Sequence, residues 1–395
     1  MTATRRPPAL ADTLAVLLPD AAETALLRVC LGIDRGATAA AWAAGIGAPG
    51  APGSIFAERP ALRRLYPMLH ATLGSEAGSA NPQLAAVLRA GVLWEEQRAA
   101  RVREILASVL SALRQVGVKP VLLKGVALAE TVYPRPGTRH CHDIDLLVSV
   151  VDQGKAAAGL KAAGFNLDGI QPGDTGTVVL LHRDGLPVQL HTRLLPTRGW
   201  LLAQDALIAR AGTIEIAGES VAMLGATDML LQVCGLAADG AGGSPSWVVD
   251  AALILRKHRL TPDKWDALAK TAVAGGLALP VLAMFTYLAG VIEIDIPESL
   301  FDALEARRPP SAEKDAVLRE LRRRPGRLTG MIAQSGWRSR VAIARWLVLP
   351  SPTHLKTWCA ERGLRWTPAW YIARPFRRLG IVAGILRMPA GSPAP

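Results

Sequence analysis

The segment HCHDIDLLVSVVD, residues 140–152, places two aspartates at the start of an apolar run that is typical of a buried strand. Buried strands usually avoid unpaired carboxylates, because removing an unpaired charge from water costs on the order of several kcal/mol. Side chains alternate along a strand, so Asp143 and Asp145 are expected on one face. The pair therefore either lies at a solvated strand end or holds a cation.

The kind of cation follows from the donor atoms. Two carboxylates on one face form a hard-oxygen site that suits Mg²⁺ or Mn²⁺, and Mg²⁺ completes its shell with phosphate oxygens and waters. The preceding His140, Cys141 and His142 resemble a transition-metal cluster, but adjacent residues of a strand face opposite ways, which disfavours zinc. The sequence predicts Asp143 and Asp145 as ligands of Mg²⁺.

The residues before this segment predict a strand, a turn and a helix. KPVLLKG (119–125) reads as a short strand that ends at Lys124 and Gly125, and VALAETVY (126–133) reads as a helix that starts directly after the glycine. A glycine at a helix start lets backbone N–H groups approach a phosphate, and the helix dipole favours that anion. Lys124 and Arg139 are then expected to balance the charge of a triphosphate.

Further elements surround this unit. WEEQRAARVREILASVLSALRQVG (94–117) has helical apolar spacing, and residues 152–163 form a second predicted helix. GTVVLLHRDGLPVQLHTRL (176–194) reads as a hairpin with Asp184-Gly185 at its turn. Residues 200–309 are predicted to be mostly helical.

The pattern as a whole predicts an α+β fold, a small mixed-sheet core flanked by N-terminal and C-terminal helical regions. The chain has 395 residues, and half of them are hydrophobic, which is enough for two or three domains. The predicted organisation is an N-terminal helical region (1–95), the core (96–198), a helical domain (199–320) and a basic C-terminal region (321–395).

Cysteine usage and hydropathy favour a cytoplasmic protein. The four cysteines lie far apart with no CxxC spacing, which argues against a disulfide framework. Pro7, Pro8 and Asp12 interrupt any signal-peptide core. The uncharged run 271–292 has the length of a membrane span, but Gly275, Gly276 and Pro280 divide it, which favours a buried core helix.

The basic charge is concentrated at the C-terminal end. The formal net charge is +12, yet residues 321–395 contain fourteen Arg and Lys against one acid. The first 320 residues, with 31 basic and 32 acidic side chains, are almost neutral. Residues 321–395 are therefore the candidate contact for a membrane surface or a nucleic acid, against the alternative of a solvated arginine face on capping helices.

The stretch LLKGVALAETVYPRPGTRHCHDIDLLV (122–148), followed by GF (164–165) and VQLH (188–191), resembles a poorly characterised nucleotidyltransferase-like family of bacteria within the DNA polymerase β superfamily. The resemblance covers residues 110–195. It extends more loosely through WVVDAALILRK (247–257) and LVLPSPTHLKTW (347–358).

The resemblance implies a reaction and its participants. Asp143 and Asp145 would bind Mg²⁺, a nucleoside triphosphate would lie over the turn at Gly125, and a nucleoside monophosphate would pass to an unidentified acceptor with release of pyrophosphate. The superfamily usually places a third carboxylate where this chain has Gln189, which cannot supply negative charge. His191 lies on the same predicted face and is a candidate general base.

Two other functions stay open at this point. The loss of an acid at Gln189 is compatible with a non-catalytic adaptor that still binds nucleotide or metal. Alternatively, the basic C-terminal region makes the protein a peripheral membrane or RNA-associated factor. Asp250 is expected to cap or pair within the helical domain, with a smaller chance of contacting substrate.

Overall fold

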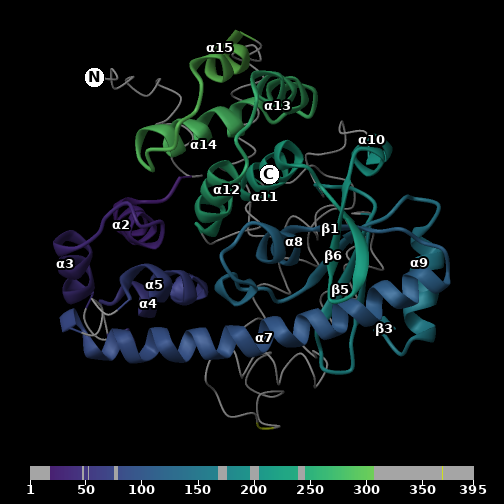
Figure 1. Cartoon of the computed structure of the whole chain (residues 1–395), viewed down its shortest axis with the longest axis horizontal. Coiled ribbons are helices and arrows are strands. Elements are labelled where there is room, and N and C mark those ends of the chain that lie inside the picture. Colours follow the sequence, from purple (N-terminus) through teal and green to yellow (C-terminus); the bar gives the residue numbers. More distant parts are fainter. Residues whose placement is uncertain are drawn as a thin grey trace, which may run out of the picture.

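The computed structural model describes residues 18–306, apart from gaps at 47–48, 52, 75–78, 168–175, 196–203 and 239–244, together with residue 367. A seven-stranded mixed sheet has the strand order β3-β4-β5-β2-β1-β7-β6. Helical regions flank it on both sides in sequence and in space (Figure 1), which confirms the predicted α+β class. The strands are β1 Val121–Leu123, β2 Ile144–Leu147, β3 Asn166–Leu167, β4 Thr177–Leu181, β5 Pro187–His191, β6 Gly212–Ile216 and β7 Glu219–Met223.

The centre of the sheet brings the predicted motifs together. β1 is antiparallel to β2 and parallel to β7, while β2 is parallel to β5. The register places Asp145 opposite Gln189 and Leu147 opposite His191. The predicted hairpin is confirmed as β4 and β5, and Gly185 at its turn has φ +83°.

Helices cover both faces of the sheet. The long helix α7 crosses beneath the sheet in Figure 1, and α9 packs against α7, β4 and β5. On the other face α8 contacts α11, and α11 packs against α12, α13 and α14. The helices are α2 Ala21–Cys30, α3 Ala37–Gly45, α4 Ile55–Glu58, η2 Pro60–Leu65, α5 Tyr66–Leu73, α7 Pro82–Gln115, α8 Lys124–Thr131, η3 Pro136–Thr138, α9 Gln153–Ala162, α10 Gln204–Ala209, α11 Ala226–Ala238, α12 Ser246–Lys257, α13 Pro262–Ala274, α14 Ala278–Gly290 and α15 Glu298–Ala306.

Two hydrophobic cores lie on opposite sides of the sheet. Ile144 and Leu146 of β2 belong to the core beneath α7 and α9. Leu147 belongs to the larger core, which joins the N-terminal helices to α11–α15. Because side chains alternate along a strand, Asp145 shares a face with Leu147 and is directed toward the helical regions.

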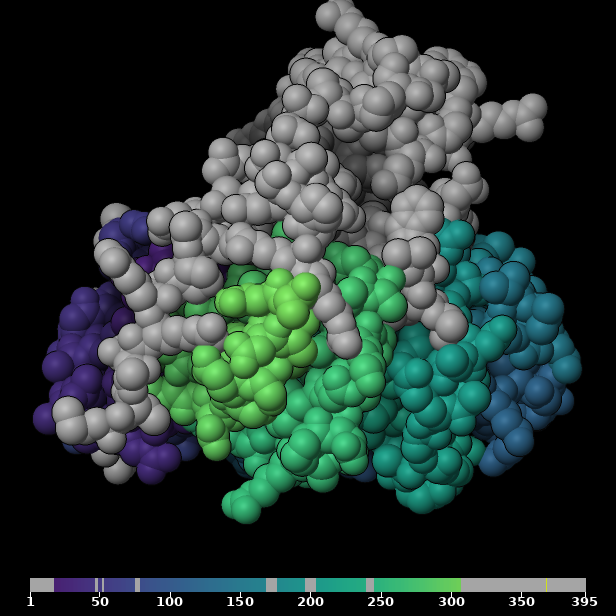
Figure 2. Space-filling model, turned by 90° about the horizontal axis from the view of Figure 1, so that it is seen from above, coloured from purple at the N-terminus to yellow at the C-terminus, as the bar shows by residue number. Residues whose placement is uncertain are grey.

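The space-filling view shows how these helical regions adjoin. The N-terminal helices, the green helices of the C-terminal helical region and the teal sheet region follow one another across the visible face (Figure 2). Residues from α2, α5, α12 and α14 share one continuous core, so the two helical regions pack together although they are distant in sequence.

The second part of the chain contains a hairpin that the helical interpretation of residues 200–309 missed. β6 and β7 pair antiparallel, and their turn residues Ala217 and Gly218 have φ +52° and +78°, the conformation of a type I′ hairpin turn. The alternation in TIEIAGESVAM (213–223) was the available signal. Because β7 pairs with β1, the sheet extends past the predicted core boundary at residue 198.

The apolar run 271–292 forms two helix segments rather than one. α13 ends at Ala274, residues 275–277 form the connection, and α14 begins at Ala278 with most of its side chains buried. Among the described residues, no helix has both the length and the apolar character needed to cross a membrane. The expectation of a buried core helix is confirmed.

Candidate functional site

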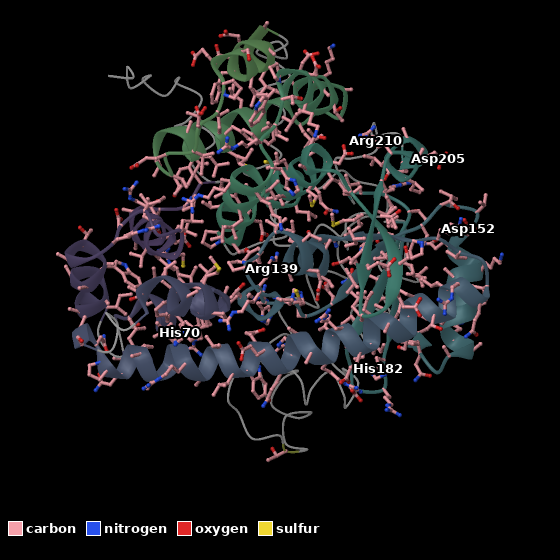
Figure 3. The ribbon with its side chains drawn as sticks, in the orientation of Figure 1. His70, Arg139, Asp152, His182, Asp205 and Arg210 are labelled. Carbon is pink, nitrogen blue, oxygen red and sulfur yellow. The ribbon has the colours of Figure 1, made fainter. Side chains whose placement is uncertain are left out.

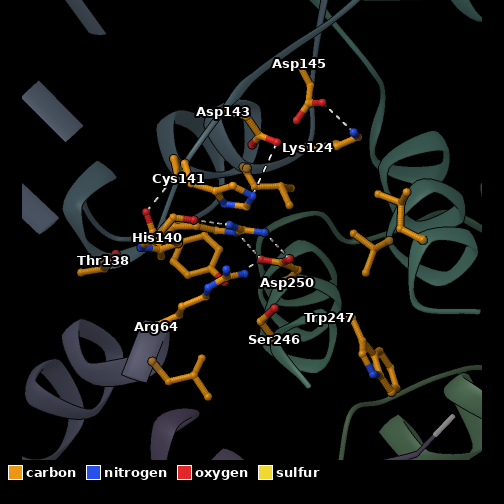
Figure 4. Close-up of a pocket in the computed structure, with 18 of the residues that line it drawn as sticks. Arg64, Lys124, Thr138, His140, Cys141, Asp143, Asp145, Ser246, Trp247 and Asp250 are labelled. Carbon is orange, nitrogen blue, oxygen red and sulfur yellow. Dashed lines mark hydrogen bonds and ion pairs between the residues drawn. The ribbon is translucent and has the colours of Figure 1, made fainter. Parts of the chain in front are cut away.

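A cavity of about 160 Å³ lies between the start of β2, the start of α8 and the helices α5, α11 and α12. Its polar end holds Lys124, Asp143 and Asp145, and the far end is formed by Ser246 and Trp247 (Figure 4). Its lining comprises Arg64, Leu65, Met68, Lys124, Gly125, Leu128, Tyr133, Thr138, Arg139, His140, Cys141, His142, Asp143, Asp145, Gln232, Val233, Leu236, Ala237, Ser246, Trp247 and Asp250.

Asp145 is the most buried carboxylate of the cavity, with its side chain 2% exposed. Its Oδ1 accepts a hydrogen bond from Lys124 Nζ at 2.6 Å and lies 2.7 Å from His191 Nε2. Burial by itself raises the pKa of this carboxyl, but Lys124 and His191 outweigh it and hold the pKa well below the usual value. Asp145 is therefore ionised in the nucleotide-free protein.

Asp143 lies just before β2 and is only partly buried. Gln189 Nε2 donates a hydrogen bond to its Oδ2 at 2.8 Å, and His142 Nε2 lies 3.6 Å from the same oxygen. Gln189 and His191 are two residues apart on β5, and they contact Asp143 and Asp145 respectively. The four side chains therefore share one face, as the alternation of the two strands predicted.

Both ring nitrogens of His191 are engaged. Nε2 contacts Asp145, and Nδ1 lies 3.0 Å from Thr177 Oγ1 on β4. Burial and the nearby Lys124 ammonium lower the pKa of His191, against the opposing effect of Asp145. A neutral imidazole that donates from Nε2 and accepts at Nδ1 satisfies both contacts.

Lys124 is held in an unusual backbone conformation. It begins α8, and its φ of +53° is in the left-handed region, which costs a non-glycine residue about 1–3 kcal/mol. Its N–H donates to Gln232 Oε1 at 3.2 Å, so a side chain of α11 takes up the first N–H of α8. The side chain of the same residue contacts Asp145.

Gln232 is a site residue that sequence reasoning missed. It is 2% exposed, lines the cavity, and its Nε2 has no hydrogen-bond partner among the described residues. A buried donor without a partner costs about 1–3 kcal/mol, so it marks a place where a ligand or water oxygen would be stabilised. The available signal was a lone glutamine within the apolar face of α11.

Arg139 pairs with a carboxylate of the same chain. Its Nε and Nη2 donate to Asp250 Oδ1 and Oδ2 at 2.8 and 2.9 Å, a bidentate contact across 111 residues of sequence. Tyr133 donates to Asp250 Oδ1 at 2.6 Å. Burial and the carboxylate raise the pKa of Tyr133 well above its usual value, so it remains a donor. Arg139 lies at the centre of the molecule (Figure 3), where it joins the loop before β2 to α12.

The His140-Cys141-His142 stretch forms no metal cluster. His140 Nδ1 contacts Glu95 of α7 at 2.8 Å, and burial raises the pKa of Cys141 to about 12, so its thiol stays protonated. Within the described residues, no group of three or more His, Cys, Asp or Glu side chains is arranged to hold a metal ion.

The donor set that remains fits a metal shared with a phosphate. Asp143 and Asp145 supply two carboxylates on one face of the sheet, which matches the one or two carboxylates that Mg²⁺ takes when a substrate phosphate completes its shell. The same set is too small for a closed all-protein site. The residues therefore fit Mg²⁺ or Mn²⁺ that arrives with a nucleotide.

The structure brings together five of the six predicted site residues, and the sixth lines the same cavity in a different contact. Lys124, Asp145 and His191 contact one another, and Asp143 lies on the same face, where it accepts a hydrogen bond from Gln189. Gly125 adjoins it in the first turn of α8, and a Cβ there would lie 3.2 Å from Arg139 Nη1. Arg139 faces Asp250 instead of the aspartate pair.

Residues 60–292 match the model of a family described as an uncharacterised nucleotidyltransferase. The match covers more than half of the chain, and the chain belongs to this family. Every residue that lines the cavity lies inside the matched range. A nucleotidyltransferase family supports nucleotidyl transfer as the general function and implies a nucleoside triphosphate as the substrate. No curated protein and no solved structure matches the chain.

Proposed function

We propose that the protein transfers a nucleoside monophosphate from a nucleoside triphosphate to an acceptor in an Mg²⁺-dependent reaction at this cavity. The observation that carries the proposal is the juxtaposition of Asp143 and Asp145 on one face, with Lys124 and the start of α8 beside them. Carboxylates, an ammonium group and helix N–H groups within one cavity are the parts that phosphoryl-transfer chemistry needs.

The roles follow from the chemistry of each group. Asp143 and Asp145 would hold Mg²⁺, which when bound neutralises charge on the phosphates and aligns the attacking and leaving oxygens. The backbone N–H groups at Gly125 and the following residue face the position of an anion at the start of α8. Lys124 supplies a positive charge next to that position.

His191 has contacts that favour a positioning role over the general-base role suggested by the sequence. Its Nε2 contacts Asp145 and its Nδ1 contacts Thr177, so neither nitrogen is directed to an acceptor hydroxyl. In this role the imidazole orients the Asp145 carboxylate, as a second partner does for many metal-binding acids. With His191 in this role, the proton that the acceptor loses would pass to bulk water.

A second candidate function is a nucleotide-binding adaptor without turnover. The observation that favours it is Gln189, which occupies the position beside Asp145 in the β2–β5 register and donates to Asp143 instead of adding a third carboxylate. Nucleotide binding without transfer to any acceptor in a cell extract would identify the adaptor.

The test is incorporation of label from α-³²P nucleoside triphosphates into the components of a cell extract. We expect Mg²⁺-dependent labelling that disappears in Asp143→Asn and Asp145→Asn. Asp152→Asn is the matched control, because Asp152 lies on the same segment but at the periphery of the view (Figure 3), where it contacts Ser149. Labelling that survives both Asp143→Asn and Asp145→Asn would contradict the proposal.

The proposed contact of residues 321–395 with a membrane surface or a nucleic acid lies outside the described residues, apart from residue 367. It stays a prediction. Truncation after Glu320 would abolish co-sedimentation with anionic liposomes or RNA, and the binding of the full chain would weaken as salt rises. Binding that the truncation leaves intact would contradict it.

A further inference from the structure

The carboxylate best placed to bind a metal is already neutralised by a lysine of the same chain. Lys124 Nζ lies 2.6 Å from Asp145 Oδ1. The side chain of Asp145 is 2% exposed and that of Lys124 is 17% exposed, and both residues line the cavity. A divalent cation on Asp145 would meet this ammonium at close range, and like charges repel strongly in a poorly solvated site.

We propose that Lys124 is an exchangeable counter-ion of Asp145. In the nucleotide-free protein its ammonium neutralises the buried carboxylate. When the metal–nucleotide complex binds, the ammonium leaves Asp145 for the phosphates, and the metal takes its place on the carboxylate. This inference rests on the proposed function and deepens it, because it assigns the metal–triphosphate complex, rather than free metal followed by nucleotide, as the species that binds.

The geometry allows the side chain to move while the backbone stays fixed. The N–H of Lys124 is held by Gln232, and the residue starts α8. Its ammonium is a compact charge on a flexible four-carbon stem, with no planar fork that commits it to one carboxylate. Arg139 lines the same cavity but makes a bidentate contact, in which two of its nitrogens donate to both oxygens of Asp250.

The charges of the network predict opposite effects on the two ligands. Asp143 and Asp145 carry two negative charges, and Lys124 cancels one of them. Removal of the ammonium leaves both charges available to a divalent cation, so affinity for metal alone should rise. The same change removes a partner of the phosphates, so affinity for a triphosphate should fall. A lysine with a purely structural role would weaken both or neither.

The first arm of the test uses Mn²⁺ alone, followed by electron paramagnetic resonance of the free ion at pH 7.5. We expect Lys124→Met to bind Mn²⁺ at least tenfold more tightly than the wild type. Lys124→Arg keeps the positive charge and should bind Mn²⁺ as weakly as the wild type. Lys119→Met is the control for the loss of a lysine, because Lys119 is exposed and outside the cavity lining. Equal Mn²⁺ affinity in Lys124→Met and the wild type would overturn the inference.

The second arm keeps Lys124 and removes its partner, in case Lys124→Met does not fold. Binding of inorganic tripolyphosphate in EDTA is measured by calorimetry. Asp145→Asn frees the ammonium for the anion, so we expect about tenfold tighter binding than in the wild type. Unchanged or weaker binding would overturn the inference. Neither arm uses transfer, so absent α-³²P labelling together with the expected Mn²⁺ and tripolyphosphate results would refute the proposed function and leave the counter-ion role standing.

Discussion

Two acid–cation pairs line the same cavity, Lys124–Asp145 where β1 ends and β2 begins, and Arg139–Asp250 between the loop before β2 and α12. Both acids are almost fully buried, with side chains 2% and 6% exposed. Arg139 grips both oxygens of Asp250, whereas Lys124 contacts a single oxygen of Asp145 that it shares with His191.

The difference indicates a structural role for the Arg139–Asp250 pair and a metal-binding role for Asp145. A bidentate guanidinium pair with a further donor from Tyr133 satisfies the carboxylate inside the fold and holds two parts of the chain together. The ammonium contacts only Oδ1 of Asp145, and Gln189 contacts only Oδ2 of Asp143, so one oxygen of each aspartate would be available to another cation.

Loss of the metal-binding acid should have the largest effect on activity. We expect Asp145→Asn to lower α-³²P transfer by about 10³-fold, because about 4 kcal/mol of transition-state stabilisation disappears with the metal. Asp250→Asn, at the other pair, should change the rate per folded molecule by less than about tenfold. Equal losses of transfer rate in the two variants would contradict the assignment of a metal-binding role to Asp145 and a structural role to Asp250.

Loss of the Arg139–Asp250 pair should have the largest effect on stability. Asp250→Asn leaves the Arg139 charge buried without its partner, so the free energy of unfolding should fall by about 3 kcal/mol in urea titrations. Asp228→Asn is the matched control: Asp228 is also paired with an arginine through two nitrogens, but the Arg210 side chain is 47% exposed. Its loss should cost about 1 kcal/mol. A smaller loss of unfolding free energy in Asp250→Asn than in Asp228→Asn would contradict the structural role of the Arg139–Asp250 pair.

Restoration of a third acid should have an intermediate effect. Gln189→Glu places a carboxylate beside Asp143, where it adds negative charge for the metal and loses the hydrogen bond that Gln189 Nε2 donates. We expect transfer to rise about tenfold, less than the roughly 10²–10⁴-fold of a well-placed general base, because the added carboxylate also repels Asp143. Gln83→Glu, at an exposed position of α7, serves as the control for an added carboxylate. No change in rate would show that the missing acid does not limit catalysis.

The smallest expected effect is a pH dependence of stability from His140. Burial lowers its pKa, although Glu95 opposes this. The unfolded chain therefore binds a proton on this histidine at a higher pH than the folded protein, and the stability contributed by the neutral ring is complete above about pH 6.5 and declines as pH falls below it. His140→Gln should flatten the decline of unfolding free energy between pH 7 and pH 5. An unchanged slope would mean that His140 is not buried in its neutral form.

The local part of the site was predictable from sequence, because it depends on short-range patterns. The strand, turn and helix around Lys124 and the Asp-x-Asp strand follow from period-two alternation and from a helix start, and the hairpin that brings Gln189 and His191 to Asp143 follows from its turn. The helix begins two residues earlier than expected, at Lys124 instead of Val126, and Lys124 itself has a positive φ.

The long-range part was not predictable from one sequence. The partner of Arg139 lies 111 residues away, and the partner of the Lys124 N–H lies 108 residues away. Charge and polarity mark Asp250 and Gln232 as residues that need partners, but nothing in the local pattern says which partners the packing of α11 and α12 will supply. The β6–β7 hairpin was missed because its short alternating strands lie between stronger helical patterns.

The most direct measurement is a crystal structure of the wild-type protein with Mg²⁺ and a nucleoside triphosphate analogue whose α,β bridge cannot be cleaved. The account predicts density for Mg²⁺ on Asp143 and Asp145, phosphates at the start of α8, and Lys124 Nζ moved from Asp145 to a phosphate oxygen. A bound nucleotide with the Lys124–Asp145 pair intact and no metal on either aspartate would contradict it.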